Sequence, residues 1–179
     1  INCYKRRIRE IVQSFKLGNV IKNGIPVAIL GAPNVGKSTL LNTILNEDKA
    51  IVSDIAGTTR DAIEDELNIE GFKFRFIDTA GIRETTDTVE NLGIKKSLEK
   101  AGIANIILFL IDADANLDNQ LLELEKIKTS AGDKLLLVIN KIDLNPEIKD
   151  NFKDALFISA KKDEGIEILK ERLLTFVNT

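Results

Sequence analysis

Short apolar runs alternate with helical stretches along most of the chain. The run Pro26–Leu30 is followed by a segment with helical periodicity from about Lys37 to Leu45, which predicts a strand that leads into a helix. Three later runs are continuously apolar, as is typical of strands buried on both faces of a sheet: 106–111, 135–139 and 156–158. Segments with helical periodicity lie beside them and are predicted to cover the sheet: about 88–101, 117–129 and 164–177.

A second pattern lies between these blocks. The runs 63–69 and 72–76 carry apolar residues at alternate positions and meet at Glu70-Gly71, so an antiparallel hairpin is predicted there. Taken together, the patterns predict an α/β fold. We expect a six-stranded, mostly parallel sheet with one antiparallel edge strand and helices on both faces.

Composition narrows the chemistry. The 179 residues are 44% apolar and 30% charged, which describes one globular domain. There is no histidine, and Cys3 is the only cysteine, so an internal disulfide, a Cys-rich zinc site and catalysis that depends on imidazole are excluded. The pI near 5.2 argues against a free-standing nucleic-acid binder. No run approaches the ~20 apolar residues of a membrane span and no leader opens the chain, so we expect a cytoplasmic protein with no membrane partner.

Residues 1–24 differ in charge from the rest. Six basic residues and the single acid Glu10 give this segment a net charge of +5, which leaves −8 for the remainder of the total of −3. A basic helix could contact RNA, but a solvated face with an apolar stripe packed on a neighbour explains the same pattern. We expect 1–24 to be a flanking helix or linker, 25–177 to be one domain and 178–179 to be a tail. Because the chain begins at Ile1 and contains no Met, we also expect an excised fragment.

Residues 31–38, GAPNVGKS, fit the pattern G-x-x-x-x-G-K-S between a predicted strand and a predicted helix. The glycines let successive N–H groups point inward, and the helix N-terminus adds partial positive charge, so the loop is suited to a polyphosphate. Lys37 is expected to reach the β and γ phosphates and Ser38 to coordinate Mg²⁺. The predicted phosphate-binding residues are Asn34, Val35, Gly36, Lys37, Ser38 and Thr39.

Two further polar segments follow buried strands, where a sheet of this kind presents ligand contacts. One contains Asn140, Lys141 and Asp143, and the other is Ser159-Ala160-Lys161. Guanine presents N1–H and N2–H₂ donors side by side, and one carboxylate, Asp143, can accept from both. Adenine offers an acceptor at N1 instead, so the pattern favours guanine. Asn140 is expected to brace the loop, Lys141 to lay its methylene stem on the ring, and the Ala160 N–H to meet guanine O6; Ser159 and Lys161 complete the predicted nucleotide-binding set.

The remaining predicted site residues surround the γ phosphate. Asp78 ends the second hairpin strand, which places a carboxylate near Mg²⁺, directly or through water. Gly81 is expected to donate its N–H to the γ phosphate. The long connection 46–61 is expected to be functional because loops of this length are uncommon in compact domains. Within it, Thr59 is the predicted magnesium ligand, with Thr58 as the alternative.

The five segments 31–38, 57–61, 78–81, 140–143 and 159–161 together resemble the ordered motifs of translation-factor-class P-loop GTPases, which have the Ras-like P-loop fold. Ile82 stands where Ras-like proteins place the glutamine that orients the attacking water. The stretch 78–97, with 51–61 upstream, resembles the GTP-binding (G) domain of the MnmE (TrmE) family of tRNA-modification GTPases, within the TrmE-Era-Der-like group. The Era and Der relatives share the first half but lack the Asp87-x-Val89-Glu90-x-x-Gly93-Ile94 continuation.

The resemblance implies a mechanism in which two G domains form a face-to-face homodimer. A potassium ion held by Asn34 and by backbone before Thr58 would take the place of an arginine finger and offset developing charge on the phosphate. Glu90 would orient the attacking water through a bridging water, so that Glu90, Lys37 and Gly81 form the predicted catalytic set. Asn34 could instead be a polar loop tip, and Glu90 a solvated acid in the first turn of a helix. Arg60 and Arg83 are alternative fingers, or surface residues in salt bridges.

The resemblance also implies a biological role. The leading hypothesis is a potassium-stimulated GTPase that converts GTP to GDP and drives wobble-uridine modification of tRNA together with a flavoprotein of the MnmG (GidA) type. The folate-binding domain, the flanking helical domain and the terminal cysteine motif of that family are not in this sequence, so the chain alone is not expected to modify tRNA, and residues 1–24 resemble the segment that enters the G domain from the helical domain. The alternatives are an Era-like or Der-like ribosome-assembly switch that gates RNA binding, and an enzyme that uses ATP.

Overall fold

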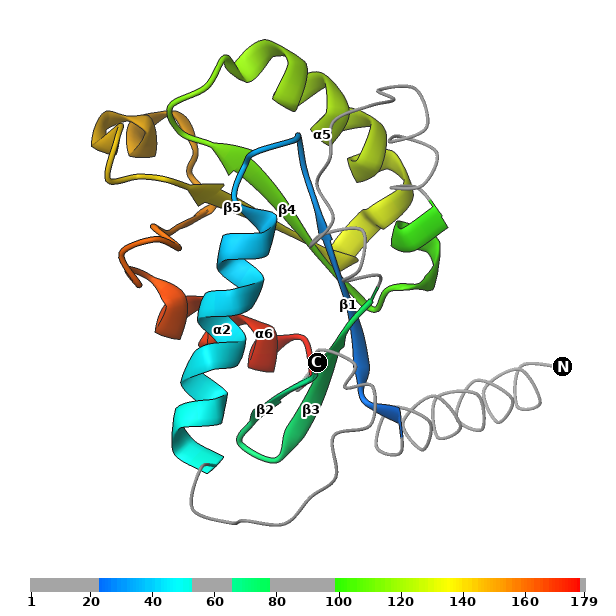
Figure 1. Cartoon of the computed structure of the whole chain (residues 1–179). Coiled ribbons are helices and arrows are strands. Elements are labelled where there is room, and N and C mark those ends of the chain that lie inside the picture. The colour runs from blue at the N-terminus through cyan, green and yellow to red at the C-terminus, as the bar shows by residue number, and fades with distance from the viewer. Residues whose placement is uncertain (1–22, 53–65, 78–98, 178–179) are drawn as a thin grey trace, which may run out of the picture.

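The computed structural model describes residues 23–52, 66–77 and 99–177, with backbone alone for 47–52 (Figure 1). Its centre is a six-stranded sheet with the strand order β2-β3-β1-β4-β5-β6. Every neighbouring pair is parallel except β2 and β3, which are antiparallel at one edge. The strands are β1 (Ile25–Leu30), β2 (Glu66–Ile69), β3 (Phe72–Phe76), β4 (Ile106–Asp112), β5 (Leu135–Asn140) and β6 (Leu156–Phe157). The predicted mixed sheet with one antiparallel edge strand is confirmed.

Helices cover both faces of this sheet, as predicted. Side chains of α2 (Lys37–Val52) and α6 (Ile166–Thr175) belong to one apolar cluster, and those of α5 (Leu117–Ala131) belong to a second. Strand β1 divides between the two clusters, because Val27 and Ile29 lie in the first whereas Ala28 and Leu30 lie in the second. Figure 1 shows α2 and α6 on one side of the sheet and α5 on the other. Alternation of this kind is what a strand buried on both faces requires.

The antiparallel hairpin is confirmed, with its turn at the predicted Glu70-Gly71. Leu67 pairs with Phe74, and the turn residues Glu70 and Gly71 have φ of 50° and 85°. Two successive positive φ values match the right-handed twist of the flanking strands, which is why Gly is favoured in such a turn. Strand β2 begins at Glu66, so the start of the predicted run at residue 63 lies outside the described residues.

Helix α2 is longer than the sequence pattern predicts. It continues to Val52 rather than ending near Leu45. The segment 46–52 contains neither Gly nor Pro, so nothing in its backbone chemistry stops the helix at the last core residue. The first part of the predicted connection 46–61 is therefore helical, and residues 53–61 lie outside the described residues. Helices α5 and α6 match their predicted positions, whereas only the end of the helix predicted at 88–101 is described, as helical residues 99–103.

Candidate functional site

The loop 31–36 joins β1 to α2 at the carboxyl end of the parallel strands. Gly31, Asn34 and Gly36 have φ of 134°, 60° and 101°. A Cβ at Gly31 would collide with the carbonyl oxygen of Leu110, and a Cβ at Gly36 would collide with Nδ2 of Asn140. The loop therefore needs its two glycines for conformation and also for space, since β4 and the last residue of β5 lie directly against it.

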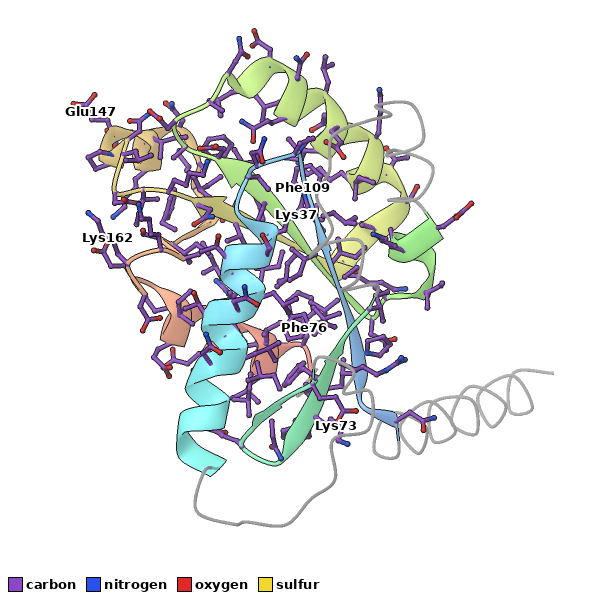
Figure 2. The ribbon with its side chains drawn as sticks, in the orientation of Figure 1. Lys37, Lys73, Phe76, Phe109, Glu147 and Lys162 are labelled. Atoms are coloured by element: carbon purple, nitrogen blue, oxygen red, sulfur yellow. The ribbon has the colours of Figure 1, made fainter. Side chains whose placement is uncertain are left out.

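Lys37, the first residue of α2, turns its ammonium group back into this loop. Its Nζ donates to the carbonyl oxygens of Gly31 and Ala32, each at 2.7 Å, and Figure 2 shows it at the start of the helix. Burial lowers the pKa of Lys37 below its usual value, and the carboxylate of Glu123 on α5 opposes this shift. A partly desolvated cation at a helix N-terminus is suited to an anion.

The other predicted phosphate-loop residues surround the same helix start. Val35 is fully buried in the core, which anchors the loop. Ser38 is half-buried in the first turn of α2, and Thr39 and Asn34 are exposed. The free N–H groups of this turn and the hydroxyl of Ser38 thus lie at the edge of the sheet where the loop opens.

Asn140, the last residue of β5, joins the phosphate loop to the segment after β6. Its side chain is buried, with the residue 2% exposed. Nδ2 donates to the Val35 carbonyl at 2.9 Å, and Oδ1 accepts from the Ala160 N–H at 3.0 Å. Each polar atom of this buried amide therefore has a partner, and the loops are held together at one edge. The Ala160 N–H predicted for guanine O6 is already engaged here, so O6 would have to share that donor with Asn140.

Asp143 lies three residues further on and is held by the segment after β6. Ser159, fully buried, donates from Oγ to Asp143 Oδ1 at 2.7 Å. Lys162 places Nζ 3.7 Å from Asp143 Oδ2, and Figure 2 shows Lys162 on the loop between β6 and α6. The hydrogen bond from Ser159, helped by the charge of Lys162, lowers the pKa of Asp143 below its usual value. The carboxylate is ionised at neutral pH and therefore available as an acceptor.

Two more predicted residues complete the base side of the site. Lys141 has φ of 63° and places Nζ 2.5 Å from Oδ2 of Asp112. Lys161 is exposed in the turn that follows Ala160. The ends of the neighbouring strands β5 and β6 thus bring together five predicted residues: Asn140, Lys141, Asp143, Ser159 and Ala160.

The structure adds residues that the sequence analysis did not single out. Thr43 on α2 donates from Oγ1 to the Ala160 carbonyl at 2.9 Å. Lys162 contacts Asp143, and Asp112 contacts Lys141. Asp112 ends a buried strand, so the rule that pointed to Asn140 could have found it. Thr43 gave no such signal, because a threonine on an amphipathic helix is ordinarily solvent-exposed.

Four predicted site residues lie outside the described part of the chain: Thr59, Asp78, Gly81 and Glu90. In the described part, no group of three or more His, Cys, Asp or Glu side chains could hold a metal ion. Magnesium at a phosphate site commonly has one or two protein ligands, with phosphate and water supplying the rest. The half-buried hydroxyl of Ser38 beside the phosphate loop fits such a set. The same described ranges contain no helix that is long and apolar enough to span a membrane.

Comparison with known proteins places residues 26–141 in the family described as 50S ribosome-binding GTPase. The chain is 56% identical to the tRNA modification GTPase MnmE of Flavobacterium psychrophilum, over 96% of this chain and 39% of that protein. It is 52% identical to the MnmE of Cytophaga hutchinsonii, over 99% of this chain and 39% of that protein. The chain thus spans about two fifths of the length of these relatives.

Solved structures with the same fold include other GTPase domains. Era in complex with MgGDPNP and a 16S ribosomal RNA segment is 30% identical, with a TM-score of 0.56, over 84% of this chain and 56% of that one. The FeoB G-domain from Methanococcus jannaschii is 26% identical, with a TM-score of 0.57, over 87% of this chain and 98% of that one.

Proposed function

Since this chain belongs to the 50S ribosome-binding GTPase family and is a GTPase G domain of the kind found in MnmE, we propose that it binds GTP along the loop edge of its sheet and hydrolyses it to GDP and phosphate. The observation that carries the proposal is the pair of hydrogen bonds made by Asn140, to the carbonyl of Val35 and from the N–H of Ala160. One buried amide couples the loop suited to phosphate to the loop suited to guanine.

The phosphate side uses backbone N–H groups and one cation. Residues 34–39 present N–H groups and the helix N-terminus to the phosphates, and Lys37 exchanges its two carbonyl partners for phosphate oxygens. Burial already disfavours the charged form of Lys37, so an anion in the loop recovers electrostatic energy that the two neutral carbonyls do not supply. This supports binding of a triphosphate at Lys37.

The base side uses Asp143 as the acceptor for guanine N1–H and N2–H₂. Ser159 orients one carboxylate oxygen, while the other faces the exposed ammonium of Lys162 at 3.7 Å, a contact that a ligand can displace. The stem of Lys141 is proposed to cover the ring, and Ala160 and Lys161 to line its edge. This arrangement favours guanine over adenine, whose N1 carries no proton.

Catalysis is proposed to involve residues on both sides of the γ phosphate. Ser38, Thr59 and Asp78 would hold Mg²⁺, Asn34 would hold K⁺, Gly81 would donate its N–H to the γ phosphate and Glu90 would orient water. When bound, the two cations offset the charge that develops on the transferred phosphoryl group. Exposure of Asn34 at the loop tip supports a role for it in reaching an ion at the surface of the domain, where a second copy of the chain would close the homodimer.

The MnmE relatives are longer than this chain. For a protein of their full length, we propose a role in tRNA modification at the wobble uridine, in the cytoplasm, with an MnmG-type flavoprotein as partner. The identity of 56% to MnmE supports this role over that of Era, to which the chain is 30% identical. Era is solved with ribosomal RNA, so a ribosome-assembly switch remains the second candidate. The division into a flanking segment 1–24, a G domain 25–177 and a tail 178–179 belongs to the same proposal.

Calorimetry with GDP and GTP in the presence of Mg²⁺ tests the nucleotide assignment. We expect binding of both, and ATP should not displace labelled GDP at a similar concentration. Equal displacement by ATP would overturn the role of Asp143.

Hydrolysis should then be compared in K⁺ and in Na⁺ for the unchanged chain and for Asn34→Ala, with the exposed Asn151→Ala as control. For the unchanged chain and for Asn151→Ala, we expect the hydrolysis rate to be lower in Na⁺ than in K⁺. For Asn34→Ala, we expect a smaller difference between the two salts. Equal rates in both salts would contradict the potassium site.

A further inference from the structure

Asp112, the last residue of β4, forms an ion pair with Lys141. Its Oδ2 lies 2.5 Å from Lys141 Nζ, and the two side chains are only 12% and 32% exposed. Lys141 has a left-handed backbone with φ of 63°, a conformation that a lysine rarely adopts and that its surroundings must hold in place. The ion pair therefore restrains the side chain of Lys141, whose backbone conformation is already constrained.

Asp112 is itself held by three hydrogen bonds, two with Gln120 and one with Asp114. Gln120 on α5, 4% exposed, accepts from the Asp112 N–H at 2.7 Å and donates to its carbonyl at 3.3 Å. The carboxylate oxygen Oδ1 accepts from the N–H of Asp114 at 3.0 Å. Because Oδ1 is committed to the loop, Oδ2 is directed to Lys141. A buried glutamine that satisfies both backbone groups of one residue fixes that residue closely.

Further hydrogen bonds connect the ends of β4 and β5. Asp112 is the register partner of Asn140, and the N–H of Ala113 donates to the Asn140 carbonyl at 2.9 Å. Asn145 donates from Nδ2 to the Ala113 carbonyl at 2.9 Å. The loop that carries Lys141 and Asp143 is thus attached at both of its ends to Ala113, the residue after β4, and the ion pair lies at the base side of the site.

We propose that Asp112 is a positioning residue for guanine recognition, which holds the ammonium of Lys141 so that the methylene stem lies against the face of the base. The proposal rests on the proposed GTP-binding function. A lysine stem has many rotamers, and a base can stack on it only after these are restricted. The ion pair restricts the Lys141 rotamers before the nucleotide binds. The hydrogen bonds with Gln120 hold the Asp112 backbone in place, so that Asp112 does not shift with the lysine side chain.

A double-mutant cycle on GDP affinity tests this role in the full chain with Mg²⁺. Asp112→Asn retains an oxygen for the Asp114 N–H but removes the charge that faces Lys141. Lys141→Met retains an unbranched stem without its ammonium. Each single variant should bind GDP roughly tenfold more weakly, the effect of one charge-assisted hydrogen bond. The double variant should be no more than about threefold weaker than either single one, because both changes remove the same contact. Asp114→Asn, an exposed neighbour, should bind within about twofold of the unchanged chain.

The outcomes separate this role from a structural one. Independent effects that multiply to about 100-fold in the double variant would show that Asp112 acts on the fold rather than through Lys141. Lys141→Met that binds as tightly as the unchanged chain would likewise overturn the proposal. If Asp112→Asn does not fold, Lys141→Arg, which keeps a cation for Asp112, should bind at least threefold more tightly than Lys141→Met, and equal affinity would overturn the proposal. An unchanged chain that binds no GDP would remove the proposed function and this inference with it, whereas normal binding with unaffected variants would remove only the inference.

Discussion

The side chain of Asn140 donates a hydrogen bond to the backbone carbonyl of Val35 at 2.9 Å, across 105 positions of sequence. The same side chain accepts from the N–H of Ala160. Three loops that follow β1, β5 and β6 are therefore linked through one buried amide, and the geometry of the candidate site depends on it.

Asn140→Ala should damage both stability and nucleotide binding. The change leaves the Val35 carbonyl and the Ala160 N–H without their partner in a buried position, which is expected to lower the free energy of unfolding by about 2–4 kcal/mol. Urea unfolding measures this effect, and calorimetry should show GDP binding weakened by at least about tenfold. The exposed Asn151→Ala should stay within about 0.5 kcal/mol of the unchanged chain; equal stability of the two variants would show that the linkage is dispensable.

Gly36→Ala should disrupt the phosphate loop. The added Cβ would meet Nδ2 of Asn140, and φ of 101° is strained for alanine. We expect a loss of stability of about 1–3 kcal/mol and a loss of measurable GDP binding. Gly102→Ala is the matched control, because nothing lies within 4 Å of its Cβ position in a helical turn, and it should stabilise the fold by about 0.5–1 kcal/mol. Thermal unfolding of both variants checks this prediction, and a stable Gly36→Ala that binds GDP would contradict it.

Asp143→Asn should change the base that the site accepts. The new amide places a donor where guanine also presents donors, so GDP affinity should fall by roughly 10²–10⁴-fold. Xanthine carries an acceptor in place of the 2-amino group, so the variant should bind xanthosine diphosphate more tightly than GDP. Competition calorimetry measures both ligands. Asp154→Asn, at an exposed carboxylate, should leave the preference for guanine unchanged, and a similar loss there would point to net charge as the cause.

Glu123→Gln should alter how stability depends on pH. Burial raises the pKa of Glu123 above its ordinary 4.5, so the folded chain binds this proton more tightly than the unfolded chain. The associated stability is full below pH 4.5 and is lost as the pH rises through the raised pKa. The variant should therefore gain stability relative to the unchanged chain between pH 4.5 and 7, by less than about 1 kcal/mol because the group is partly solvated. Urea unfolding at both pH values tests this, with the exposed Glu171→Gln as a control that should show no such gain.

Much of the site could be predicted because its residues lie at ends of elements that the apolar pattern identifies. Lys37 begins a helix that follows an apolar strand, and Asn140 is the last residue of an apolar strand. Their positions therefore follow from local periodicity. The extent of α2 could not be predicted in this way, since core contacts mark only its first part while its backbone chemistry permits more. Gln120 was missed because a polar residue on an amphipathic helix gives no local sign of burial.

The amino-acid sequence by itself determined the order of strands and helices, the two glycines that let the phosphate loop close, and the residue types suited to a guanine nucleotide, because each depends on neighbours within a few positions. The tertiary structure alone decided the partners: that Asn140 bonds to Val35, that Ser159 lowers the pKa of Asp143, and that Asp112 pairs with Lys141. These contacts arise from the strand order β1-β4-β5-β6, which brings the ends of distant strands to one edge. No local pattern encodes which of those ends become neighbours, since sheet pairing is settled by the packing of the whole core.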